Sequence, residues 1–146
     1  AKYFKRIPKI IIVEPDRADC VLQSIKSRKL KKIKIKKESI MGGMSCNQMS
    51  YIPWQILKKA SNHCVSVSDR NVPKTVALLK DKKLSKNSII GGECSAPGII
   101  SLVSVCNDLN TKKMIKLNEQ SNILIIGCEG NADVKLYKQL LSKGRK

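Results

Sequence analysis

Aromatic residues are scarce in this 146-residue sequence, which holds one Trp, three Tyr and one Phe. Histidine occurs once, as His63, and none of the six cysteines belongs to a CxxC pair. A structural zinc site needs clustered thiolate or imidazole ligands, so we expect no metal centre here, and we interpret His63 as structural. Proteins that bind single-stranded nucleic acid stack bases on aromatic side chains, and this chain offers few of them.

Long apolar runs are also lacking. The longest near-continuous run, residues 99–105, is interrupted by Ser101 and Ser104, whereas a membrane-spanning helix needs about 18 apolar residues. No charged and then apolar leader with a small-residue cleavage site is evident. We therefore expect a cytoplasmic protein without a membrane partner, in which the cysteines are reduced and mostly buried.

Acidic residues are few, since 11 Asp and Glu stand against 29 Lys and Arg, which gives a net charge of +18. The densest basic segment, residues 26–37, could attract phosphate groups through counterion release. It contains no aromatic residue, and its Lys-Ile alternation over residues 32–36 predicts a half-buried strand with lysines in solvent. A basic nucleic-acid-binding module therefore remains an alternative and not the leading hypothesis.

The hydrophobic fraction of 42% is enough for one compact domain. Short β-branched or apolar runs alternate along the chain with segments of helical spacing. The predicted strands are residues 9–13, 32–36, 64–68, 89–93 and 123–126, and the predicted helices are residues 16–27, 53–60, 69–84, 95–108 and 132–141. This alternation predicts an α/β fold with a mostly parallel sheet and helices on both faces.

Three glycine-bearing turns, at residues 41–44, 91–95 and 127–130, fall where predicted strands end. Ligands of open α/β sheets bind at the carboxyl ends of the strands. Glycine allows the backbone to approach a ligand closely, although each turn taken singly is equally typical of plain structure. Together the three turns favour a cofactor crevice.

The sequence around these turns resembles one enzyme family in order and spacing. The matching segments are residues 10–20, 39–46, 92–98, 117–121 and 127–133. They resemble the C-terminal part of the diaminopropionate ammonia-lyases, which are pyridoxal-phosphate (PLP) enzymes of fold type II. The resemblance implies a partial unit of the tryptophan synthase β-like fold. A serine or threonine dehydratase of the same group remains an alternative.

This resemblance implies α,β-elimination of a small amino acid, 2,3-diaminopropionate, to pyruvate and ammonia. In the family the Schiff-base lysine and the phosphate-binding glycine loop precede the strand that begins near Lys9. The chain starts at Ala1 without an initiator Met. We therefore expect residues 1–146 to be the C-terminal portion of such an enzyme, inactive without its N-terminal half and homodimeric when complete. Whether the chain is an enzyme by itself stays open.

The resemblance also assigns four cofactor-binding positions. Cys128 falls where the group places a small hydroxyl residue facing the pyridine nitrogen of PLP, and Glu93 matches an acidic position beside the same ring. Gly42 and Gly43 would let the backbone pass against the cofactor. The alternatives are a buried thiol for Cys128, a helix N-terminal carboxylate for Glu93 and a plain turn for the glycines.

Two acidic residues beside these positions, Glu129 and Asp133, are predicted to cap the last helix rather than to act on substrate.

Overall fold

The computed structural model of the chain describes residues 7–146, so the expectation drawn from the Ala1 start concerns residues outside this range. Two parallel strands lie at its centre, β1 (Ile11–Pro15) and β2 (His63–Val67), with Ile11 opposite His63 and Pro15 opposite Val67. Both strands are rich in Val and Ile, which favour a pleated, buried surface. The predicted strands at residues 9–13 and 64–68 are confirmed, with shifts of one or two residues.

Six α-helices and three short 3₁₀ turns complete the described part of the chain. These are α1 (Cys20–Ser27), η1 (Gly42–Met44), α2 (Tyr51–Ala60), η2 (Asp69–Asn71), α3 (Val72–Lys80), η3 (Glu93–Ser95), α4 (Pro97–Asn107), α5 (Leu109–Met114) and α6 (Val134–Gly144). Every predicted helix is present, and α5 is an additional one.

Two helix boundaries differ from the prediction by four residues. The helix predicted from residue 16 begins at Cys20, because the chain first makes a turn in which the Ala18 amide donates to the Pro15 carbonyl at 3.0 Å. The helix predicted to reach residue 84 ends at Lys80, and Lys82 takes a left-handed conformation (φ 58°) that stops helical propagation.

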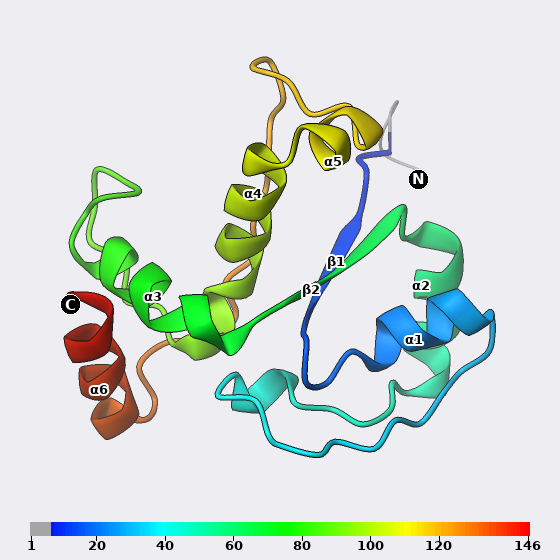
Figure 1. Cartoon of the computed structure of the whole chain (residues 1–146), viewed down its shortest axis with the longest axis horizontal. Coiled ribbons are helices and arrows are strands. Elements are labelled where there is room, and N and C mark those ends of the chain that lie inside the picture. The colour runs from blue at the N-terminus through cyan, green and yellow to red at the C-terminus, as the bar shows by residue number, and fades with distance from the viewer. Residues whose placement is uncertain (1–6) are drawn as a thin grey trace.

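The helices lie on both sides of the strand pair. In Figure 1, α1 and α2 lie on one side and α3, α4 and α6 on the other. α4 contacts both strands, and α3 packs along α6. The main hydrophobic core lies among α3, α4, α6 and the end of β2. It consists of Met41, Val67, Val72, Val76, Cys94, Ala96, Ile100, Tyr137 and Leu140.

Three predicted strands are wrong. Residues 32–36 keep the expected alternation, with Ile33 and Ile35 half-buried between exposed lysines, but they are not in a strand, and the Ile33 amide donates to the Asn47 carbonyl at 2.8 Å. Residues 89–93 lead into η3, and in the run at residues 123–126 only Ile125 is half-buried while the other three side chains are exposed. A strand needs a hydrogen-bonded neighbour, and within the described residues only β1 and β2 provide one for each other. The observed fold is therefore mixed α/β with a two-stranded parallel sheet.

The cysteines only partly follow the prediction of burial. Cys20 and Cys94 are buried and Cys64 is half-buried, whereas Cys46, Cys106 and Cys128 are exposed, and all six are free thiols. Over residues 7–146, no helix combines the length and the apolar character that crossing a membrane requires.

Candidate cofactor-binding site

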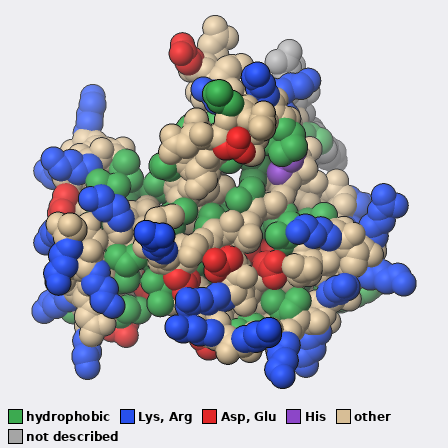
Figure 2. Space-filling model, viewed as in Figure 1, with side chains coloured by type: hydrophobic (Ala, Val, Ile, Leu, Met, Phe, Trp, Pro, Cys, Tyr) green, Lys and Arg blue, Asp and Glu red, His purple; other side chains and the backbone are tan. Residues whose placement is uncertain are grey.

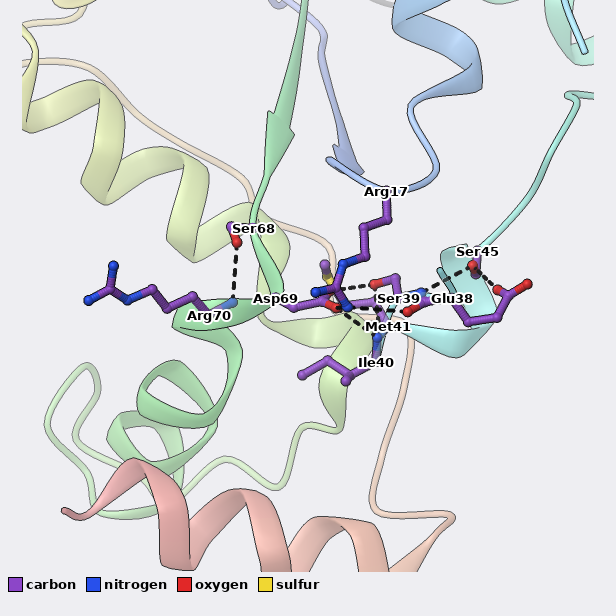
Figure 3. Close-up of polar contacts among 9 residues, drawn as sticks. All are labelled: Arg17, Glu38, Ser39, Ile40, Met41, Ser45, Ser68, Asp69 and Arg70. Carbon is purple, nitrogen blue, oxygen red and sulfur yellow. Dashed lines mark hydrogen bonds and ion pairs between the residues drawn. The ribbon is translucent and has the colours of Figure 1, made fainter. Parts of the chain in front are cut away.

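A buried carboxylate joins the segments that follow the two strands. Arg17 comes two residues after β1, Asp69 comes two residues after β2, and the Arg17 guanidinium lies 2.6 Å from the Asp69 carboxylate. The same carboxylate accepts hydrogen bonds from the Ser39 hydroxyl at 2.5 Å and from the Ile40 amide at 3.1 Å. Figure 3 shows these three groups converging on Asp69, which is only 8% exposed.

This network fixes the loop that carries the first glycine turn. Arg17 also donates to the Glu38 carbonyl at 3.3 Å, and the Ser39 hydroxyl accepts from the Met41 amide at 3.0 Å. The Met41 side chain is fully buried directly before Gly42. Because the loop is held on both sides of Ile40, η1 is placed at the carboxyl ends of the parallel strands, where ligands of α/β sheets bind.

The sequence alone did not reveal the role of Asp69 in this network. Its neighbour Ser68 caps the 3₁₀ turn η2, since the Ser68 hydroxyl accepts from the Arg70 amide at 3.4 Å. The only local signal for the network is that Arg17 and Asp69 stand at equivalent positions after two strands, which is informative only once those strands are known to be adjacent and parallel.

A second carboxylate joins the other two glycine turns. The Glu129 side chain accepts from the Cys94 amide at 2.8 Å, and the Glu129 carbonyl accepts from the Gly92 amide at 3.0 Å and from the Ser95 hydroxyl at 2.6 Å. Glu129 therefore does not cap α6, contrary to the prediction. Asp133 does, since its carboxylate accepts from the Leu136 amide at 2.8 Å.

The first turn meets the other two at Cys94. A Cβ atom placed on Gly43 would lie 3.4 Å from the Cys94 sulfur, so the glycine backbone and this thiol are in contact. The structure thus brings together the turns that contain the four predicted site residues. A Cβ atom on Gly42 or on Gly130 would meet no atom within 4 Å, so open space adjoins the backbone at both glycines.

Burial shapes the electrostatics of this region. It raises the pKa of the half-buried Glu93 carboxyl, and the negative charges of Glu129 and Asp133 raise it further. Burial, together with Glu129, raises the pKa of the Cys94 thiol to about 12. Cys128 is exposed, which excludes the alternative that its thiol is buried in this chain. The site thus offers the neutral thiol of Cys94 and accessible glycine backbone. It also offers the Glu93 carboxyl, which retains its proton more readily than usual.

Basic residues are spread over the visible face and are not gathered in one patch of it. Figure 2 shows Lys and Arg side chains around the edge of this face and also within it, with Asp and Glu near its middle and at its top and left edges. Within residues 7–146, no cluster of three or more His, Cys, Asp and Glu side chains could hold a metal ion.

Comparison with known proteins connects this geometry to one enzyme. The chain is 28% identical over 138 residues to diaminopropionate ammonia-lyase of Escherichia coli K12, which covers 92% of this chain and 35% of the relative. The chain is homologous to diaminopropionate ammonia-lyase. The lyase of Salmonella typhimurium LT2 is 25% identical over 150 residues. The chain spans just over a third of the length of these curated relatives, and no family model matches it.

Solved structures agree on the fold. The Escherichia coli lyase in complex with an aminoacrylate–PLP azomethine reaction intermediate matches with a TM-score of 0.79 and 28% identity, over 94% of this chain and 35% of the lyase. Serine racemase from Dictyostelium discoideum matches with a TM-score of 0.63 at 20% identity, over 86% of this chain. At that identity the racemase supports the fold alone, which is the fold of the type II PLP enzymes.

Proposed function

We propose that this chain forms the C-terminal part of a PLP-dependent diaminopropionate ammonia-lyase and supplies one wall of its cofactor site. One observation carries the proposal: in a chain homologous to this lyase, three glycine turns distant in sequence meet beside the carboxyl ends of parallel strands. Asp69 holds the first turn and Glu129 holds the other two, so the wall is fixed by the chain itself.

The residues of this wall fit a planar cofactor. Open space beside Gly42 and Gly130 lets a flat ring approach the backbone closely, which a side chain would prevent. The exposed Cys128 thiol would face the pyridine nitrogen as a weak, neutral hydrogen-bond partner. A neutral partner leaves that nitrogen largely unprotonated, which suits elimination better than chemistry that needs a strong electron sink.

Glu93 and the glycines complete the proposed contacts. Glu93 would hold a proton beside the same ring, consistent with its raised pKa. PLP supplies the electron-withdrawing chemistry of α,β-elimination when it is bound. The resemblance assigns the Schiff-base lysine and the phosphate loop to the N-terminal half of the enzyme, so we propose that activity requires that half and that the complete enzyme is a homodimer.

The experiment combines this chain with a polypeptide that comprises the N-terminal part of the Escherichia coli lyase, which this chain does not match. We expect the mixture to bind PLP and to release pyruvate from 2,3-diaminopropionate, and either component alone to release none. Serine and threonine serve as separate substrates, because faster turnover of either would favour the dehydratase alternative. Cys128→Ala should alter the absorption spectrum of bound PLP, whereas Cys106→Ala, at another exposed thiol, should not. A mixture without PLP binding contradicts the proposal.

A further inference from the structure

Ser95 is a buried serine whose hydroxyl pairs with both backbone groups of one distant residue. The hydroxyl donates to the Glu129 carbonyl at 2.6 Å and accepts from the Glu129 amide at 3.3 Å. Ser95 is only 8% exposed, so water competes little for these two hydrogen bonds. One side chain therefore holds the backbone of Glu129 at its donor and at its acceptor.

The same side chain contacts the residue on the other side of Cys128. A Cβ atom placed on Gly127 would lie 3.2 Å from the Ser95 hydroxyl oxygen, and the three atoms nearest to it all belong to Ser95. Within residues 7–146, no backbone–backbone hydrogen bond involves Cys128 itself. The backbone of Cys128 is therefore held through its two neighbours, and both of them lie against Ser95.

We propose that Ser95 is a positioning residue of the cofactor site, which fixes the place of the Cys128 thiol and acts on the PLP ring through that thiol. This inference rests on the proposed function, in which Cys128 faces the pyridine nitrogen. A thiol is a weak hydrogen-bond donor, so a small displacement of Cys128 would lose the contact. A buried hydroxyl that clamps the turn on both sides of Cys128 prevents that displacement.

Ser24 provides a matched control in another part of the molecule. Its hydroxyl donates to the Cys20 carbonyl at 2.6 Å and accepts from the Lys31 amide at 2.9 Å, and the residue is fully buried. It belongs to α1, which lies on the opposite side of the strand pair from α4 (Figure 1). Ser24→Ala therefore removes an equivalent buried hydroxyl without touching the turn that carries Cys128.

The first measurement is hydrogen exchange in the chain alone. We expect Ser95→Ala to speed exchange at the Glu129 and Gly92 amides at least tenfold. The Glu129 amide loses its acceptor, and the Gly92 amide donates to the carbonyl that Ser95 holds. Ser24→Ala should lower the urea midpoint but change both exchange rates less than twofold. Unchanged exchange in Ser95→Ala would overturn the inference.

The second measurement is the absorption spectrum of PLP bound to the mixture with the N-terminal polypeptide of the Escherichia coli lyase. Ser95→Ala should shift the absorption maximum in the same direction as Cys128→Ala, and Ser24→Ala should not shift it. In the double variant, Ser95→Ala should add no shift to that of Cys128→Ala, because coupled residues are not additive. A merely structural role would give an additive shift, which would overturn the inference.

Failure of this inference is distinguishable from failure of the proposed function. A PLP spectrum that responds to Cys128→Ala but not to Ser95→Ala would refute the positioning role and sustain the proposed function. A mixture that binds no PLP would refute the proposed function and, with it, the action of Ser95 on the cofactor, even where hydrogen exchange shows that Ser95 holds the turn.

Discussion

Replacing Asp69 by alanine tests the claim that one carboxylate places the first glycine turn. The substitution leaves the Ser39 hydroxyl and the Ile40 amide without their acceptor and removes the ion-pair partner of Arg17. Removing one partner of a buried ion pair costs about 3–5 kcal/mol. The Arg17 side chain is 35% exposed and can be rehydrated, which places the expected loss of unfolding free energy at the lower end, about 3 kcal/mol.

The fluorescence of Trp54, the single tryptophan and 5% exposed, reports unfolding in urea. Asp69→Asn keeps an oxygen acceptor and loses the charge, so it should fall between alanine and the unchanged chain. The matched control is Asp81→Ala, which breaks the exposed ion pair with Arg145 and should cost much less, because solvent screens exposed pairs. Equal losses for Asp69→Ala and Asp81→Ala would refute the reasoning, as would unchanged hydrogen exchange at the Ile40 amide in Asp69→Ala.

Three further predictions concern the turns and the titrating groups. Gly92→Ala should destabilise the chain and Gly130→Ala should not, as measured by urea midpoints, because a Cβ atom on Gly92 would collide with the Gly130 carbonyl oxygen whereas one on Gly130 meets open space. Iodoacetamide at neutral pH should modify Cys128 well before Cys94, as mass spectrometry of peptides can show. Burial and a pKa of about 12 keep the Cys94 thiol inaccessible and protonated, so equal rates of modification would contradict the burial of Cys94. Arg145, directly after α6, donates hydrogen bonds to the Asp81 carboxylate and lowers the pKa of that group below its usual 3.8. The stability that this ion pair contributes is therefore present above that pH and is lost as the pH falls through the lowered pKa. Thermal melts between pH 2 and 6 should therefore depend less steeply on pH in Asp81→Asn.

The parts of the fold that sequence predicted well are those with local causes. β1 is a β-branched run, and α6 begins at an aspartate that caps it and continues with apolar residues on one face. The meeting of the three glycine turns was anticipated from their positions after predicted strands and from the family resemblance. The carboxylate networks of Asp69 and Glu129 were not anticipated, because each joins residues about 30 or more positions apart whose proximity depends on how the helices and strands pack.

The wrong strand predictions have a common physical cause that is itself informative. Two of the wrongly predicted segments do have strand-forming sequences: the alternation of Ile33 and Ile35 with lysines, and the apolar run at residues 123–126. β-Branched side chains and burial of every second residue suit a pleated surface. Such a segment becomes a strand only when a neighbour satisfies its amides and carbonyls, and residues 7–146 supply neighbours for β1 and β2 alone. The exposed Leu124 and Ile126 show that strand-forming residues stay irregular and accessible to solvent where residues 7–146 offer them no hydrogen-bonded neighbour.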